Sequence, residues 1–201
     1  MRGWQHYGTK TLQVVPYMPG TPVYLDNMLP HIYFSLKQEG KIADTFCGED
    51  KNLDEFISYF HRIKTAQVLC RVGPELKLDP VGISWVDLPR GVDGARAAQI
   101  GMAFFGDVTR YWDARCLGCL GLAYMFIDLE INVLHGIQLV SNYRARNFAK
   151  KLFFREVATV PAWHYVDGQL EDARVMMLRR GEFLPGFEDW FAKQEPAIKN
   201  P

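Results

Sequence analysis

Residues 134–156 read LHGIQLVSNYRARNFAKKLFFRE, and this stretch indicates a strand, a helix and the start of another strand. Residues 137–140, with Ile137, Leu139 and Val140 apolar, form the expected strand. Asn142 is a residue type preferred at a helix N-cap, and residues 143–153 follow it as a helix. The chain is therefore predicted to run β-α into a further strand that begins at Glu156.

On the C-terminal side of this stretch, the chain is predicted to form a β-hairpin. Its strands are residues 156–166 and 171–178, and they are joined by Asp167-Gly168, a dipeptide that favours a tight hairpin turn. The polar tail that follows offers Trp190 and Phe191 as candidate anchors to the fold.

On the N-terminal side, apolar spacing predicts further elements in the order β-α-α-β-β-β-α. Pro30 falls inside the first helix, which either kinks there or begins there. The whole order, β-α-α-β-β-β-α-β-α-β-β, indicates an α/β fold with a mixed sheet. The expected strands are residues 11–15, 66–72, 81–88 and 98–105, and the expected helices are residues 24–37, 52–63 and 114–134.

Length and composition indicate one domain with a real core. The chain has 201 residues, of which 48% are hydrophobic and 13% aromatic. We expect a domain over residues 11–180, between an arm (1–10) and a tail (181–201). The 23 basic and 23 acidic side chains give zero net charge, which argues against a broad basic face for nucleic acid. A neutral chain is also compatible with association into homo-oligomers.

Neither cysteines nor histidines form a pattern typical of a metal site. Cys116-x-x-Cys119 lacks the second pair or histidine partners of a structural zinc site. Burial as small hydrophobic side chains is favoured, and a redox pair at a helix start is the alternative. Cys47 and Cys70 are single, and no metal is expected.

No membrane or secretory segment is expected. The opening residues have no apolar stretch, and the most apolar segment, residues 116–127, is shorter than the roughly 20 residues of a bilayer span. Few cysteines and no leader predict a cytoplasmic, reduced protein, in the host cytoplasm or the virion if a phage encodes it.

The helix over residues 143–153 is basic. Its cations are either a solvated face or an anion site, and nucleic acid is the less favoured ligand. The cluster comprises Arg144, Arg146, Lys150, Lys151 and, just beyond the helix, Arg155.

The second half of the chain resembles the GNAT acyltransferases, especially the branch that acetylates the amino termini of ribosomal proteins. The resemblance covers residues 99–178 without a gap. It rests on Tyr111-Trp112, Leu134-His135-Gly136-Ile137, Asn142-x-x-Ala145, Lys151-Leu152-Phe153-Phe154-Arg155-Glu156 and the hairpin Tyr165-Val166-Asp167-Gly168-Gln169 with Glu171-Asp172.

That resemblance implies a GNAT fold and an acetyl-CoA site. In the family, a strand splays from its neighbour and its backbone pairs with the pantetheine arm; here that strand is residues 100–104. A glycine-rich turn and the next helix then hold the pyrophosphate. The implied cofactor-binding residues are Met102, Ala103, Phe104, Asp113, Ala114, Arg115, Cys116, Asn142 and Arg146.

The chain departs from the family at this turn. Asp113 and Arg115 replace its two glycines, and Leu117 replaces the small residue after them. An acid facing a pyrophosphate is unfavourable, whereas Arg115 is a candidate direct ligand of the phosphates.

The catalytic side also departs from the family. Ala149 occupies the position of the tyrosine that protonates the departing thiolate, and the central strand over residues 81–88 carries only Asp87. Asp107 and Asn142 are the candidate catalytic residues, with a simple N-cap as the alternative role of Asn142.

Two functions follow from these observations. The first is an N-acyltransferase that uses acetyl-CoA to acylate an amine. The second is a degenerate GNAT-like protein that has lost the cofactor and binds protein partners in an assembly, such as a phage virion or head, with which some GNAT-like proteins of tailed phages are associated.

Overall fold

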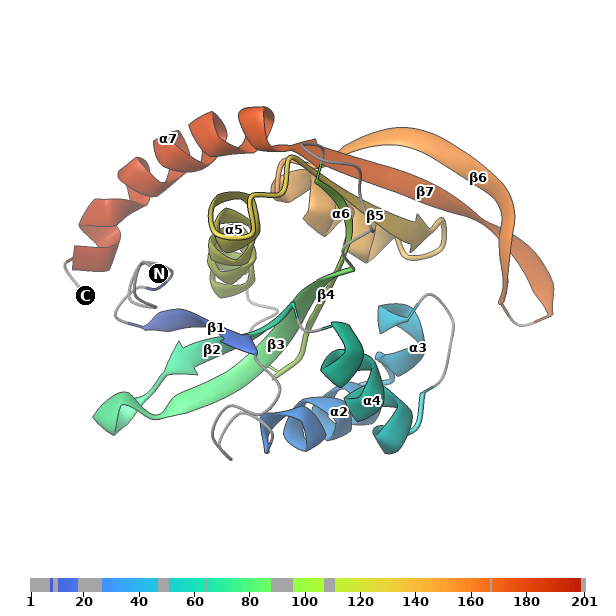
Figure 1. The fold of residues 1–201 in the computed structure, drawn as a ribbon, viewed down its shortest axis with the longest axis horizontal. Coiled ribbons are helices and arrows are strands. Elements are labelled where there is room, and N and C mark those ends of the chain that lie inside the picture. Colours follow the sequence, from blue (N-terminus) through green and yellow to red (C-terminus); the bar gives the residue numbers. More distant parts are fainter. Residues whose placement is uncertain are drawn as a thin grey trace.

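The computed structural model describes residues 8, 11–17, 27–46, 51–63, 65–87, 96–106, 111–166 and 168–199. A seven-stranded sheet in the order β1-β2-β3-β4-β5-β7-β6 runs through the molecule (Figure 1). Its neighbours pair antiparallel except β4 and β5, which are parallel. The strands are β1 (Leu12–Tyr17), β2 (Ala66–Val72), β3 (Leu78–Asp87), β4 (Ala97–Phe104), β5 (Val133–Leu139), β6 (Arg155–Val166) and β7 (Gln169–Arg179).

Helices lie on both sides of the sheet. In Figure 1, α2, α3 and α4 lie below the strands, and α5 lies above them under the long α7. The predicted order of elements is confirmed, with α3 and α7 added to it. The helices are α2 (Met28–Gln38), α3 (Ile42–Thr45), α4 (Leu53–Ile63), α5 (Tyr111–Ile127), α6 (Tyr143–Lys151) and α7 (Arg180–Lys199), with a 3₁₀ turn at Pro74–Leu76.

Local sequence explains how α2 and α4 begin and end. Helix α2 starts at Met28, so Pro30 lies in its first turn, where a missing N–H costs no hydrogen bond. Gly40 follows the helix at φ +67°. Asn52 and Glu55 cap α4 reciprocally, because each side chain accepts a hydrogen bond from the other residue's backbone N–H.

Alternate sheet residues face two separate cores. On β4, Ala98 packs in the core under α5 and α7, and Ala103 packs in the core under α2 and α4. Trp85 fills the second core and its Nε1 donates to the hydroxyl of Tyr59 at 3.0 Å. Gly101 lies so close to the Trp85 ring that an added Cβ would be 2.0 Å from it.

The predicted helix over residues 114–134 was wrong at its C-terminal end. Helix α5 stops at Ile127, and Glu130 takes a left-handed conformation (φ +52°) that no helix continues through. Val133 and Leu134 then join β5, because they pair with both β4 and β7. Strand β5 consequently starts earlier than predicted.

The segment predicted as a polar tail forms helix α7. Phe183 is fully buried and Trp190 is 9% exposed, and both belong to the core that also contains α5. Phe191 packs against that core, so both predicted anchors are confirmed. Of the predicted arm over residues 1–10, only Gly8 is among the described residues; it bridges to Gln13.

Over the residues that the structure describes, no helix combines the length and apolar character that crossing a membrane requires.

Candidate functional site

Strands β4 and β5 separate after a short paired region. Their parallel pairing is confined to residues 97–99 of β4 and 133–135 of β5, and it ends at Gln99 and His135. Beyond that point β4 continues to Phe104 and β5 to Leu139. Figure 1 shows the two strands diverging, so the splay predicted from the resemblance is present. We call the region between the diverging strands the wedge.

The backbone of β4 has polar groups that face the wedge. The N–H of Phe105 donates to the carbonyl of Val81 at 3.0 Å, and in an antiparallel pair the bonding residues alternate. Ala103 therefore bonds to β3 and buries its side chain, whereas Met102 directs its N–H and C=O toward the wedge. The last β4–β5 pair is Gln99 with His135, so among the described strands the pairing has ended before Met102.

The end of β4 is tied to the segment between α2 and α3. Lys41 Nζ donates to the carbonyl of Phe104 at 3.0 Å, and the N–H of Gly106 donates to Glu39 Oε1 at 2.6 Å. Partial burial raises the pKa of Glu39, but the hydrogen bonds from Lys41 and Gly106 outweigh it and hold the pKa below its usual value. The Phe104 ring meets Phe148 of α6 edge to face at 5.5 Å.

Asp113 and its neighbours lie inside helix α5, not in a turn. The Asp113 carboxylate accepts hydrogen bonds from Arg71 of β2, at 3.0 Å from Nη2 and 3.2 Å from Nε. Its charge is therefore already paired within the fold. Ala114 and Cys116 are buried in the core beneath the helix and present no polar side-chain group to a cofactor.

Arg115 is held by aromatic rings. Its guanidinium lies 5.5 Å from the ring centroid of Trp190 on α7 and 5.9 Å from that of Phe153 after α6. Among the described residues it makes no ion pair, and its Nε is buried without a hydrogen-bond partner. Arg115 is thus a fixed cation near the start of α5.

Asn142 is the N-cap of α6, which was one of the two roles predicted for it. Its Oδ1 accepts from the N–H of Ala145 at 3.1 Å, which leaves the amide nitrogen for another contact. Arg146 is half-buried, and its side chain has no hydrogen bond or ion pair with a described residue. Ala149, at the tyrosine position, is buried, and Asp107 lies outside the described residues.

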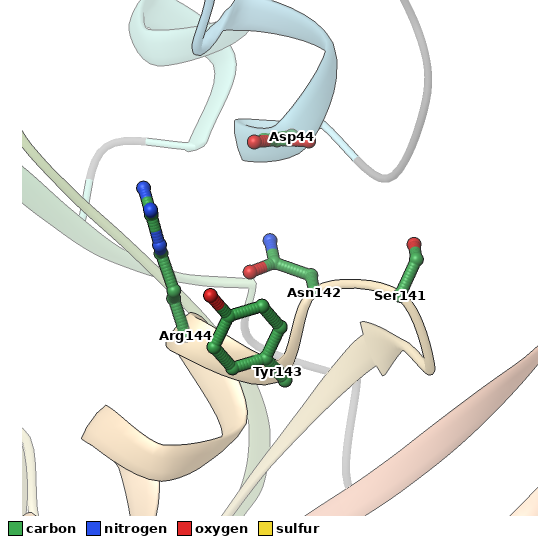
Figure 2. A pocket seen from close by; sticks show the side chains of 5 residues that line it. All are labelled: Asp44, Ser141, Asn142, Tyr143 and Arg144. Atoms are coloured by element: carbon green, nitrogen blue, oxygen red, sulfur yellow. The ribbon is translucent and has the colours of Figure 1, made fainter.

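A small open pocket of about 180 Å³ lies between α3 and the start of α6 (Figure 2). The sequence singled out Asn142 and Arg144 but missed the other three residues. Asp44 belongs to a helix of four residues that had no periodic signal, and Ser141 and Tyr143 carry no motif. The lining residues are Asp44, Ser141, Asn142, Tyr143 and Arg144.

His135 lies where the strands separate. Leu134 and Ala98 are paired and point into the core under α5, so their neighbours His135 and Gln99 point to the opposite face of the sheet. Burial lowers the pKa of His135, so the imidazole is neutral at neutral pH. The spacing of residues in the sequence could not identify His135 as a candidate catalytic residue, because its position at the fork depends on non-local strand pairing.

The cysteines are core residues. Cys116 and Cys119 are buried, and burial raises the pKa of each thiol to about 12. The alternative of a redox pair is therefore wrong, since a redox thiol needs a lowered pKa. Across the described part of the chain, His, Cys, Asp and Glu side chains form no cluster that could hold a metal.

The cations of α6 do not act as one cluster. Arg155 pairs with Glu182 of α7 at 3.0 Å, and Lys150 and Lys151 are exposed on the helix surface. Arg144 alone of this group lines the pocket.

Comparison with known proteins identifies the fold. No protein-family model and no curated protein sequence matches the chain. Its structure is similar to a GNAT-family acetyltransferase from Bacillus anthracis, with a TM-score of 0.66, 10% identity, and coverage of 87% of this chain and 98% of that one. It is also similar to a chimera of the spermidine N-acetyltransferase SpeG from Vibrio cholerae and hSSAT, at TM-score 0.66, 15% identity, and coverage of 86% of this chain and 98% of that one.

A third similar structure is the Vibrio cholerae spermidine N-acetyltransferase in complex with CoA and spermine, with a TM-score of 0.62, 15% identity, and coverage of 86% and 98%. At such identities the likeness establishes the fold alone. The chain has the GNAT fold, as the resemblance implied.

Proposed function

We propose that this protein is an N-acyltransferase that transfers the acyl group of acyl-CoA, with acetyl-CoA as the expected donor, to an amine. The observation that carries the proposal is the end of β4–β5 pairing at Gln99 and His135. It leaves the wedge-facing backbone of β4 available to a ligand in extended conformation.

The residues of β4 fit the pantetheine arm. Met102 offers an N–H donor and a C=O acceptor on the wedge side of the strand, and the amides of pantetheine have the complementary groups. The arm would bind as an added strand does, by main-chain hydrogen bonds.

The start of α5 suits the phosphates of the same ligand. Arg115 is a fixed cation without a carboxylate partner among the described residues, and α5 adds the positive end of its dipole. Asp113 was expected to disfavour a bound pyrophosphate. Its carboxylate is paired with Arg71, so it does not present an unpaired negative charge to the phosphates. A direct phosphate contact from Arg115 is part of the proposal.

Acyl-CoA supplies a thioester carbonyl; the amine nitrogen attacks its carbon, the C–S bond breaks, and an amide and the CoA thiol result. The amine must lose a proton in this exchange. His135, neutral at the fork of the strands, is the proposed acceptor of that proton. The amide nitrogen of Asn142 is free to hold a water or the ligand, because its oxygen alone forms the cap.

The substitution Met102→Pro tests whether the backbone N–H of residue 102 binds the ligand. Proline removes the N–H that faces the wedge and leaves every hydrogen bond between β3 and β4 in place. We expect acetyl-CoA affinity, measured by isothermal titration calorimetry, to fall about tenfold, as loss of one ligand hydrogen bond predicts. Met102→Leu is the matched control and should bind as the wild type does. Absence of acetyl-CoA binding to the wild type, or equal binding by Met102→Pro, would overturn the proposal.

The alternative of a cofactor-free assembly module gains no support from the similar structures described above, which are all acetyltransferases. The substitutions that motivated it have structural explanations. Asp113 forms an ion pair, Arg115 packs on rings, and Leu117 and Ala149 are buried.

A further inference from the structure

Two side chains of opposite charge line the pocket beside the wedge. Asp44 lies on α3 and Arg144 on α6, and both side chains are exposed. Neither forms an ion pair or a side-chain hydrogen bond with any described residue. Figure 2 shows Asp44 on one side of the pocket, across from Asn142 and Tyr143, and the Arg144 side chain extending along the pocket toward the level of Asp44.

Both walls of the pocket are fixed to the strands that form the wedge. Lys41, at the N-cap of α3, bonds to the carbonyl of Phe104 at the end of β4. Ser141 follows β5, and its N–H and hydroxyl both bond to Glu171 of β7, the hydroxyl at 2.9 Å. The pocket therefore spans the side of the wedge where the two strands have moved apart.

We infer that this pocket binds the acceptor, and that the acceptor is a zwitterionic amine of the size of a free amino acid. The inference rests on the proposed function. An ammonium group would donate hydrogen bonds to the Asp44 carboxylate, and the acceptor's carboxylate would accept the two parallel N–H bonds of the Arg144 guanidinium. The hydroxyl of Tyr143 and the amide nitrogen of Asn142 supply further polar contacts on the same wall.

The charges argue against a polyamine in this pocket. A polyamine has several ammonium groups and no anion, so Arg144 would repel it while Asp44 could pair with only one group. A peptide amino terminus lacks the nearby carboxylate that Arg144 requires. A volume of about 180 Å³ also suits a small molecule, since pockets for drug-sized ligands start at about 300 Å³.

The test compares acceptors that differ in one charge. Each proteinogenic amino acid, its methyl ester and spermidine are assayed with acetyl-CoA by release of the CoA thiol. We expect the best amino acid to exceed its methyl ester at least about tenfold in kcat/KM, the effect of losing a charge-assisted hydrogen bond pair. Arg144→Gln should remove most of this preference, and Asp44→Asn should lower the rates of acid and ester alike. Lys150→Gln on the same helix and Asp54→Asn on α4 are matched controls that should change neither.

The outcomes separate this inference from the proposed function. Turnover in which the methyl ester or spermidine equals or exceeds every amino acid overturns the inference and leaves the acyltransferase intact. If acetyl-CoA is neither bound nor consumed, the proposed function fails, and saturation-transfer NMR with the amino acids alone then decides the inference. Signals lost in Asp44→Asn and Arg144→Gln but kept in both controls support a zwitterion site; no signal in the wild type overturns it.

Discussion

Arg71 and Asp113 form an ion pair that joins β2 to the first turn of α5, with Nη2 and Nε both donating to Oδ2. Each side chain is about one-third exposed, at 33% and 31%. The pair explains how an acid can occupy a position where the family resemblance implies a glycine. Its negative charge is balanced from the sheet beneath and is not presented to the ligand.

Asp113→Asn should therefore have a small effect on both stability and ligand binding. We expect the free energy of unfolding to fall by about 0.5–1 kcal/mol, the range for partly exposed pairs, and acetyl-CoA affinity to change less than about threefold. Urea denaturation and calorimetry measure the two quantities. A double-mutant cycle with Arg71→Gln isolates the pair. An affinity gain of tenfold or more would show that Asp113 repels the phosphates after all.

Gly101 and Gly136 offer a matched steric test of the two diverging strands. A Cβ at Gly101 would lie 2.0 Å from the Trp85 ring, whereas one at Gly136 would have no contact closer than 3.7 Å, to Ile100. Gly101→Ala should lower the free energy of unfolding by about 1–3 kcal/mol through overpacking, and Gly136→Ala by well under about 1 kcal/mol. Equal destabilisation in urea would contradict the packing described for Trp85.

The buried thiols predict a specific pH dependence. Burial raises the pKa of Cys116 to about 12, so the folded state keeps its proton at pH values where the unfolded thiol ionises. Stability is unaffected below the unfolded pKa of about 8.5 and falls as pH rises from there toward 12, by up to about 1.4 kcal/mol per pH unit. Cys116→Val should show a shallower loss of stability above pH 9 in urea denaturation. Identical slopes would mean that the thiol is not buried in solution.

Local signals in the sequence were sufficient for much of the fold. The strand over residues 66–72 was predicted with the bounds observed for β2, and Asp167-Gly168 placed the hairpin correctly. The helix expected over residues 52–63 is also present, and Asn52 caps it. The hairpin turn and the cap depend on residues within a few positions of each other, and the strand was recognised from its own run of β-prone residues.

Elements that depend on distant partners could not be predicted in this way. Leu134 follows Ile131 at a spacing compatible with a helix, yet it belongs to β5 because β4 and β7 pair on either side of it. Helix α3 is too short to show a period. Trp190 and Phe191 were predicted only as separate anchors of a tail. Helix α7 packs Phe183 and Trp190 together against one core.

The candidate site was predictable only in part. The splayed strand and the importance of Asn142 were implied by the family resemblance over residues 99–178. The partner of Asp113 and the approach of Asp44 to Arg144 join segments far apart in the chain, and neither has a sequence signal. The residues that distinguish this protein's site are those that the fold brings together.

Asn142 combines a structural and a proposed functional role, and two substitutions separate them. Asn142→Asp keeps the oxygen that caps α6 and removes the amide nitrogen, whereas Asn142→Ala removes both. We expect Asn142→Ala to lower the free energy of unfolding by about 1 kcal/mol and Asn142→Asp to leave it nearly unchanged. Both should lower kcat/KM of acyl transfer. Full activity in Asn142→Asp would restrict this residue to capping.

Trp190 joins helix α7 to Arg115, and its removal should be costly to stability. The indole is 9% exposed and lies 5.5 Å from the Arg115 guanidinium. Trp190→Ala should lower the free energy of unfolding by about 3–5 kcal/mol, because it leaves a cavity beside a half-buried cation. Trp190→Phe should retain part of this stability, and Glu188→Ala, exposed on the same helix, should retain nearly all of it. Urea denaturation measures all three. If Trp190→Ala unfolds at the wild-type midpoint, α7 does not pack against α5 in solution, and Arg115 is then not held in place for the phosphate contact that we propose.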